Sequence, residues 1–211
     1  MRRSAKVAFR VEGASAADGR ARRGERSRHR IVSALFDLIG GGALQPTAQQ
    51  VADRAGVGIR SVFRHFSEME SLYAEMDARL EAEAVVLLQR DDRAGSLDDR
   101  VRALVRQRAR LFERIAPYKR AGNLQRWRSP FLQGRHLHMQ RRLRANLQEW
   151  LPELKGAPPG LVEALELAAS FESWDRLRGD RQLNQKLVAA VIARTVGALL
   201  RDHRAAGRRA R

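Results

Sequence analysis

The sequence contains no cysteine, and this absence excludes disulfide bonds, thiolate catalysis and any zinc site that depends on sulfur ligands. No apolar run approaches the roughly 18 residues of a membrane-spanning helix, so no membrane partner is predicted. An export signal is not expected either, because Arg10 and Glu12 interrupt the start of the chain before an apolar segment can form. These absences predict a protein of a reducing compartment, which we expect to be the cytoplasm.

Acidic residues are also scarce relative to basic ones. The 211 residues include 24 Asp and Glu but 41 Lys and Arg, which gives a formal net charge of +17. The excess lies in three segments, residues 1–30, 101–150 and 201–211. A charge of this size predicts a polyanionic partner without identifying it, while 44% hydrophobic residues leave enough material for a sizeable core.

Apolar residues recur at three-to-four spacing along most of the chain, and no alternating pattern typical of β-strands stands out. We therefore predict an all-α fold of about nine helices. Residues 1–24 lack this periodicity and are interpreted as a flexible basic arm, so ordered structure is expected from near Glu25.

Capping and breaking residues set the expected helix boundaries. Two capping boxes, at residues 47–50 and 67–70, predict the starts of two helices. Pro117 and Pro130 are expected to divide the middle of the chain. The last two helices are expected at residues 161–178 and 181–204.

Residues 47–66 carry the pattern of a helix-turn-helix unit. Gly56 suits the left-handed conformation that ends the first helix, and Gly58 is an acceptable N-cap for the second. Val62 is predicted to point inward, so that the first turn of the second helix projects outward as a recognition helix does in the major groove. The pattern predicts binding to double-stranded DNA; the simpler interpretation is an ordinary pair of helices joined by a glycine turn.

Residues 22–72 resemble the N-terminal region of the TetR family of transcriptional regulators. The similarity rests on the Thr-capped helix, the Val-Ala-Asp-Arg-Ala-Gly-Val sequence at 51–57, the aromatic Phe63, and Arg-His-Phe at 64–66 before a long helix. It implies a three-helix DNA-binding domain followed by a larger helical domain for effector binding and dimerisation, in a homodimer.

This resemblance gives the expected division of the chain. The basic arm at residues 1–24 would precede the DNA-binding domain at 25–70. The effector-binding and dimerisation domain would span residues 71–205, and residues 206–211 would form a basic tail.

The resemblance also implies which side chains meet the DNA. Thr47 would contact a phosphate, Arg60 lies where the family reads base edges, and Arg64 and His65 are phosphate candidates. Phe63 occupies the family's frequent tyrosine position, so it keeps the ring but lacks the hydroxyl group. The predicted DNA-binding residues are Thr47, Gln49, Gly58, Ile59, Arg60, Ser61, Phe63, Arg64 and His65.

One positive charge of the family pattern is missing, because Met69 stands where the family often has a lysine. We expect the arginine-rich segment near the N-terminus to compensate; the alternative is a solvated tail that does not contact DNA. The arginines concerned are Arg20, Arg22, Arg23, Arg26, Arg28 and Arg30.

The family generally places its effector pocket between the middle helices. This sequence gathers Tyr118, Trp127, Phe131, His136 and Met139 there, and they are the predicted pocket residues. The alternative is that these side chains, His136 included, belong to an ordinary helical core.

A row of arginines in the same region has two interpretations. Arg102, Arg106, Arg110 and Arg114 follow i, i+4 spacing, which is typical of a solvated helix face. Because like charges at this spacing repel, the row could instead line a site that receives an anionic effector.

The last two helices of such regulators usually form a four-helix dimer interface. The resemblance places Leu165, Phe171, Trp174, Val191 and Leu199 in that interface.

No catalytic group, metal site or cofactor is predicted, so the chain is not expected to be an enzyme. The Gly56-x-Gly58-x-x-Ser61 sequence follows a helix instead of a strand, and His136 and His138 would point about 200° apart on a helix. We predict a repressor released from a near-palindromic operator by a small-molecule effector. Two alternatives remain: a sequence-tolerant architectural DNA binder that uses its arginine-rich arms, and a helical small-molecule sensor or enzyme with a vestigial helix-turn-helix.

Overall fold

The computed structural model describes residues 16–89 and 94–209, and within these ranges it contains nine α-helices and no strand. The all-helical prediction is confirmed. Within the same ranges, no helix combines the length and the apolar character that crossing a bilayer requires. In chain order the elements are α1 (Ala16–Gly40), α2 (Ala48–Ala55), α3 (Ile59–His65), α4 (Met69–Leu88), α5 (Leu97–Gln125), the 3-10 turn η1 (Arg126–Arg128), α6 (Pro130–Trp150), the 3-10 turn η2 (Pro152–Leu154), α7 (Pro159–Ala168), α8 (Phe171–Asp175), the π-helical turn η3 (Arg176–Asp180) and α9 (Gln185–Arg209).

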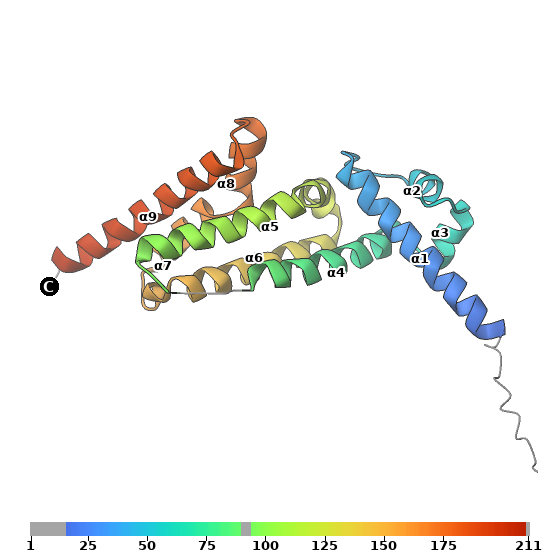
Figure 1. Cartoon of the computed structure of the whole chain (residues 1–211), viewed down its shortest axis with the longest axis horizontal. Helices are drawn as coiled ribbons and strands as arrows, with labels where there is room; N and C mark the ends of the chain where they lie inside the picture. Colours follow the sequence, from blue (N-terminus) through green and yellow to red (C-terminus); the bar gives the residue numbers. More distant parts are fainter. Residues whose placement is uncertain (1–15, 90–93, 210–211) are drawn as a thin grey trace, which may run out of the picture.

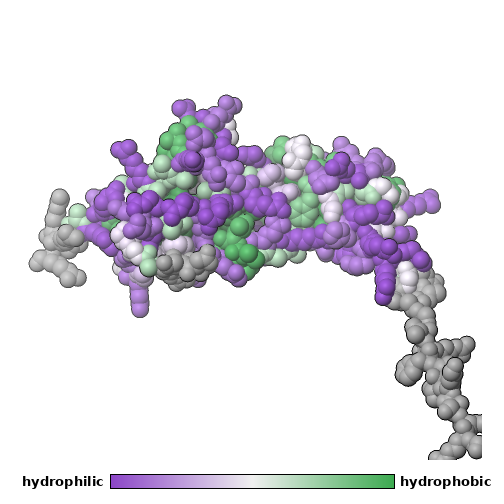
Figure 2. Space-filling model, in the orientation of Figure 1, coloured by the Kyte–Doolittle hydropathy of each residue, from purple (hydrophilic) through white to green (hydrophobic). Residues whose placement is uncertain are grey.

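Two hydrophobic cores divide the molecule along its long axis (Figure 1). α1, α2, α3 and the start of α4 enclose the first core at one end. The rest of α4 runs lengthwise with α5 and α6, while α9 packs against α5 and extends to the opposite end. Hydrophilic side chains cover most of the face shown in Figure 2, and hydrophobic ones reach it only in separate patches. Because α4 and α5 contribute to both cores, continuous helices join the two ends of the molecule.

The first core is built by the apolar periodicity of α1. Ile31 and Leu35 are completely buried, and they pack with Val51 of α2, Val62 of α3 and Leu72 of α4. The short helices α2 and α3 each pack a side chain between the longer helices α1 and α4. This packing stabilises α2 and α3, although neither helix is long enough to be stable alone.

The second core is centred on aromatic rings from α5 and α8. The ring centroids of Phe112 and Phe171 lie 5.6 Å apart, and Trp174 lies 6.0 Å from Phe112 and 5.7 Å from Phe171. All three side chains are buried, and aliphatic residues of α6, α7 and α9 close around them. These edge-on and tilted contacts add to the free energy gained from burial.

Helix α1 begins nine residues before the expected start of ordered structure. It extends from Ala16, so residues 16–24, expected to belong to the flexible arm, are helical. Residues 1–15, the remainder of the predicted arm, and residues 210–211 of the predicted tail lie outside the described residues. The sequence lacks an apolar stripe before Glu25 because this first part of α1 projects beyond the core (Figure 1).

The capping box expected at residues 67–70 does not form. α4 begins at Met69, and its N-cap residue Glu68 makes no side-chain capping bond. The Glu70 carboxylate, which would have to bond back to the N-cap, instead accepts a hydrogen bond from the Ser129 hydroxyl group. A contact from a distant helix has replaced the local one.

Pro117 does not divide the chain, because α5 continues through it to Gln125. A proline inside a helix removes one backbone hydrogen bond, which costs about 3 kcal/mol. Here Ile115 and Ala116 are buried in the second core and Ala121 in the first, so burial on both sides of the proline holds the helix together.

The C-terminal region is divided earlier than expected. α7 ends at Ala168, and the Ser170 side chain caps α8 by accepting a hydrogen bond from the Ser173 backbone N–H at 3.0 Å. The predicted helix at 161–178 is therefore three segments, α7, α8 and η3. The final helix α9 starts at Gln185, four residues later than expected.

Candidate nucleic-acid interface and ligand pocket

The turn between α2 and α3 has the geometry that its glycines predict. Gly56 adopts a left-handed conformation, with φ 63° and ψ 42°, which few residues other than glycine reach without strain. The Val57 backbone N–H donates to the Ala52 carbonyl at 3.0 Å, and this bond closes the end of α2. Gly58 is the N-cap of α3. The chain therefore reverses within three residues and starts α3 in a defined direction.

Helix α3 is anchored by one face and exposes the other. Val62 is 1% exposed and Phe66, which follows the helix, is 2% exposed. Ile59 and Phe63 are 37% and 48% exposed, so two large apolar side chains of this short helix face solvent. Arg60 is exposed on the same helix. The outward face thus offers apolar surface beside a cation, and both suit contact with a base edge and a thymine methyl group.

Polar side chains around α3 are held by local hydrogen bonds. The Thr47 hydroxyl oxygen accepts from the Gln50 backbone N–H at 3.2 Å, so its own hydrogen remains available to a phosphate. The Arg64 guanidinium donates to the Ser61 hydroxyl oxygen at 3.2 Å. Gln49 donates to the Asp53 carboxylate at 2.7 Å, so a contact between Gln49 and DNA must replace that bond. The structure brings Thr47, Ser61 and Arg64 to one exposed end of the domain.

His65 faces α1 instead of the exposed side of α3. Its Nε2 atom is buried without a hydrogen-bond partner, and its ring lies beside Gly24. Burial lowers the pKa of the His65 imidazole, and Arg64 and Arg28 lower it further. The predicted phosphate contact is therefore not supported by the geometry, because the ring is neutral and its Nε2 atom points inward.

Arg28 was predicted to contact DNA together with the other N-terminal arginines. In the structure its side chain instead makes contacts within the protein. Its guanidinium forms an ion pair with Glu75 at 2.8 Å and lies 4.6 Å from the centre of the Phe66 ring. These contacts fasten α1 to α4 and to the end of α3. Arg23, Arg26 and Arg30 are exposed on α1 and remain candidates for phosphate contact.

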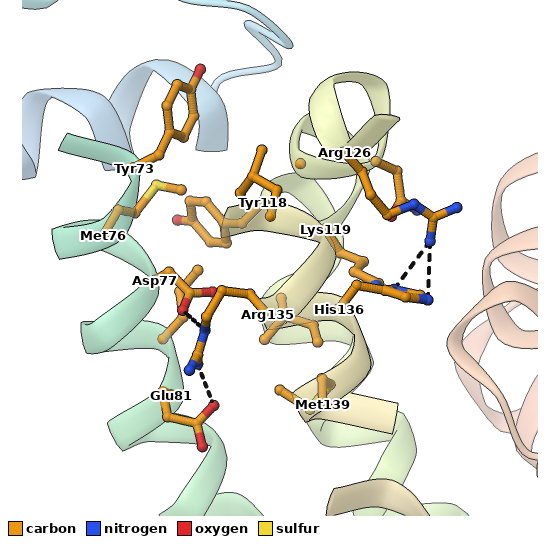
Figure 3. A pocket seen from close by; sticks show the side chains of 15 residues that line it. Tyr73, Met76, Asp77, Glu81, Tyr118, Lys119, Arg126, Arg135, His136 and Met139 are labelled. Atoms are coloured by element: carbon orange, nitrogen blue, oxygen red, sulfur yellow. Dashed lines mark hydrogen bonds and ion pairs between the residues drawn. The ribbon is translucent and has the colours of Figure 1, made fainter. Parts of the chain in front are cut away.

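A pocket lies between α4, α5 and α6, with a cavity volume of about 100 Å³ (Figure 3). Tyr118, His136 and Met139 of the predicted set line it. Trp127 and Phe131 do not: Trp127 is 73% exposed, and the Arg126 guanidinium lies 4.5 Å from the centre of its ring. Three of the five predicted residues therefore line one cavity, and the two aromatic residues Trp127 and Phe131 lie outside it.

Charged residues that the sequence analysis did not assign also line the pocket. On one side Arg135 forms ion pairs with Asp77 and, at 2.8 Å, with Glu81. Burial raises the pKa of the Asp77 carboxyl, although Arg135 opposes that shift. On the other side lie Lys119 and Arg126, which contact His136 (Figure 3). Spacing could not reveal these residues, since they come from different helices.

One pocket residue also contacts α1, which belongs to the first core. The Tyr118 ring meets the Phe36 ring of α1 edge-on, with centroids 5.1 Å apart. Above the pocket the Tyr73 hydroxyl accepts a hydrogen bond from Gln125 at 3.1 Å, which joins α4 to the end of α5. The pocket wall and the first core are therefore in direct contact.

The arginine row of α5 does not line this pocket. Arg102, Arg106, Arg110 and Arg114 are exposed; the first pairs with Asp99 at 2.7 Å, and the last pairs with Glu83 at 2.6 Å. The solvated-face interpretation fits this arrangement, and these side chains do not receive an effector in the pocket.

Three of the five residues predicted for the dimer interface lie inside a single chain. Leu165, Phe171 and Trp174 are 0%, 3% and 2% exposed, so they belong to the second core and offer no surface to a partner. Val191 is 37% exposed and Leu199 is half-buried, both on α9. These three residues were assigned to the interface because a sequence does not distinguish an apolar stripe that packs in its own core from one that contacts a second chain.

Comparison with known proteins agrees with the geometry. Residues 31–76 match the family model of the bacterial regulatory proteins of the tetR family, and the match spans α2, α3 and the turn between them. No curated protein matches the sequence.

Three solved structures have a similar fold. A transcriptional regulator from Rhodococcus sp. Rha1 has a TM-score of 0.64 and 22% identity, over 83% of this chain and 97% of its own. A candidate regulator from Streptomyces coelicolor A3(2) has a TM-score of 0.57 and 23% identity, over 81% and 98%. A candidate TetR-family regulator from Mesorhizobium loti MAFF303099 has a TM-score of 0.57 and 18% identity, over 84% and 96%. The family model therefore identifies residues 31–76, which contain the helix-turn-helix, as a DNA-binding region of the tetR type, and the solved structures show that the fold of the whole chain is shared with transcriptional regulators.

Proposed function

We propose that this regulator is a homodimeric repressor that binds a near-palindromic operator and leaves it when a small molecule enters the pocket. The observation that carries the proposal is the arrangement of α3. Its inward residues Val62 and Phe66 are fully buried, while Ile59, Arg60 and Phe63 face solvent. A helix held in this way is a rigid probe that can enter a major groove without reorganising the domain.

The dimer is supported by an exposed apolar surface on α7 and α9, two helices that pack together. Leu167 is 70% exposed, Leu187 46% and Val191 37%. A second copy on this surface would remove these side chains from water. Twofold pairing would place the two α3 helices in successive major grooves, about 34–36 Å apart.

Release by a small molecule is supported by the contacts of the pocket. Its wall includes Tyr118, which packs on Phe36 of α1, and α4 leads from the pocket directly into the DNA-binding domain. A ligand that fits the pocket better when α4 is displaced would favour a dimer in which the two α3 helices are wrongly spaced. It can shift that equilibrium only by its difference in affinity for the two arrangements.

Selection of bound sequences from a random DNA library tests the proposal. We expect enrichment of two inverted half-sites separated by about 10 base pairs centre to centre. The variants Arg60→Ala and Phe63→Ala should change or abolish the enriched motif. Retention of DNA without any enriched motif would favour the architectural alternative, and absence of retention would favour the sensor.

A further inference from the structure

Three basic side chains from three elements meet at one end of the pocket. Lys119 of α5 has its ammonium 2.7 Å from the Nδ1 atom of His136 on α6. Arg126 of η1 has a guanidinium nitrogen 3.1 Å from the same atom and 3.0 Å from Nε2. Figure 3 shows the three groups pointing toward one another at the side of the pocket opposite Asp77. We refer to Lys119, Arg126 and His136 as the basic cluster.

The basic cluster has more hydrogen-bond donors than acceptors. Burial lowers the pKa of His136 to about 4, and Lys119 and Arg126 lower it as well, so the imidazole is neutral at neutral pH. A neutral imidazole has one lone pair, yet an ammonium and a guanidinium both point at it. In addition, the Nε atom of Arg126 is buried and has no partner. Such a cluster lacks an acceptor.

The protein does not pair these two cations directly with a carboxylate in the part of the chain that the structure describes. Among the described residues, no carboxylate forms an ion pair with Lys119 or Arg126, whereas Arg135 across the pocket is paired with Asp77 and Glu81. Burial lowers the pKa of Lys119, the charge of Glu172 opposes this shift, Arg126 adds to it, and Asp77 opposes it more weakly. On one side of the pocket the cation is thus paired with carboxylates, and on the other side two cations have no carboxylate in direct contact among the described residues.

Arg108 shows how this fold satisfies a guanidinium that has only a structural task. Its side chain is fully buried, and burial lowers its pKa to about 10. Its nitrogens nevertheless donate to the Ala169 carbonyl at 2.9 Å, to the Leu143 carbonyl and to the Asn146 side chain. Among the described residues, Arg126 has no comparable set of carbonyl or amide acceptors, so the shortage of acceptors is specific to the basic cluster.

The remainder of the pocket is apolar and small. Met76, Leu80, Ile115, Leu132 and Met139 contribute to its lining. A cavity of about 150 Å³ admits benzene. The cavity of about 100 Å³ in this pocket therefore admits an apolar group of a few carbon atoms, and longer chains require the two methionines to move.

From these observations we infer that the pocket binds an organic carboxylate, with its anionic group on Lys119 and Arg126 and its apolar body between α4 and α6. The inference rests on the proposed effector role of the pocket and names the chemical class of that effector. The carboxylate oxygens supply the missing acceptors, and two cations hold one anion in a partly dehydrated site. Tyr118 then lies between the bound molecule and Phe36 of α1.

Isothermal titration of the full-length dimer with butanoate, hexanoate, octanoate and benzoate tests the inference. At least one of these acids is expected to bind with a Kd of about 1 mM or below. The matched primary amide and alkylammonium should bind at least about tenfold more weakly, since they lack the charge. Inorganic phosphate should not compete, because it has no apolar body. Equal binding of amide and acid, competition by phosphate, or no binding by any acid would overturn the inference.

Three variants locate the anion. Lys119→Met and Arg126→Gln should each weaken the best acid at least about tenfold. Arg128→Gln removes the same charge from an exposed neighbour that does not line the pocket, and it should change the Kd less than about twofold. An equal loss in all three would show that general electrostatic attraction is responsible, and would refute the site. Thermal unfolding of each variant without ligand detects a folding defect.

Operator affinity, measured on the same samples without acid, separates this inference from the proposed function. Intact operator binding together with failure of every acid would refute the carboxylate and leave the regulator. Tight acid binding without sequence-selective DNA binding would refute the regulator and leave the carboxylate site.

Discussion

Positive charge is exposed at one end of this molecule and enclosed near its middle. On α3, Arg60 and Arg64 are exposed, and Arg64 only meets the hydroxyl of Ser61. In the pocket, Lys119 and Arg126 crowd a neutral imidazole, and burial lowers the pKa of the lysine. Water and salt ions screen the exposed charges on α3 effectively, but they have little access to the enclosed charges in the pocket.

The difference in exposure suits two kinds of anion. Exposed cations gain affinity by displacing the counterions of a polyanion, and each contributes a little to a large total. Enclosed cations are already partly dehydrated, so one small anion can gain much from two of them. The same charge therefore serves DNA at α3 and a single carboxylate in the pocket.

Salt should separate the two sites more than any substitution. A dimer that contacts about six phosphates is expected to lose about 10³-fold in operator affinity between about 50 and 200 mM salt. Carboxylate binding in the pocket should weaken less than about tenfold over the same range, because the site is partly enclosed. Titrations of both ligands at the two salt concentrations measure the contrast, and similar slopes would show that the pocket cations are as solvated as those on α3.

Arg60 and Arg64 are expected to differ from each other. Loss of a base contact in Arg60→Ala should cost about 1–3 kcal/mol on the operator and little on random DNA. Loss of a phosphate contact in Arg64→Ala should weaken both DNAs alike and reduce the salt slope by about one unit. Fluorescence anisotropy with both DNAs measures this, with Arg181→Ala as a charge-matched control far along the chain. Equal weakening by Arg60→Ala on the two DNAs would refute its assignment to a base.

The exposure of α3 depends on the turn at Gly56. Because Gly56 has φ 63°, Gly56→Ala should lower the free energy of unfolding by about 1–2 kcal/mol. Gly134→Ala is the control: this glycine lies in α6 with open space around it, and the change should stabilise the helix by about 0.5–1 kcal/mol. Denaturant unfolding measures the free energy of unfolding of both variants. An unchanged value for Gly56→Ala would show that a side chain at this position does not strain the turn.

The pH dependence of stability tests the enclosure of the basic cluster. The pKa of His136 is lowered to about 4, so the unfolded chain binds its proton more readily. The free energy of unfolding should therefore decrease as the pH falls from about 6.5 toward 4, because protonation of His136 favours the unfolded chain. Lys119 and Arg126 add to this effect, and Glu172 opposes it. Titration of the histidine NMR signals, with His136→Gln to assign the signal, should give this low pKa. A value near 6.5 would mean that the basic cluster is open to water.

The sequence predicted the α2–α3 unit well because its determinants are local. Thr47, Gly56 and Val62 lie within twenty residues, and each acts on a neighbour in the chain. The capping bond, the left-handed glycine and the buried valine are all found where the pattern predicts them.

The pocket was predicted only in part because three separate helices build it. Tyr118, His136 and Met139 were predicted from their position between the middle helices, where the family generally has its pocket. The prediction for Trp127 was wrong because the sequence does not indicate in which direction a large aromatic side chain between two helices points. Lys119 and Arg126 were missed because charged residues normally face water, and only the packing of α5 and η1 against α6 encloses these two.

The most direct test of the central claim is the ratio of affinities for the selected operator and for random DNA of equal length at physiological salt. If α3 reads bases while exposed arginines bind phosphates, the ratio should be about 10³ or greater. A ratio near one would contradict the account, because it would mean that charge alone holds this protein on DNA.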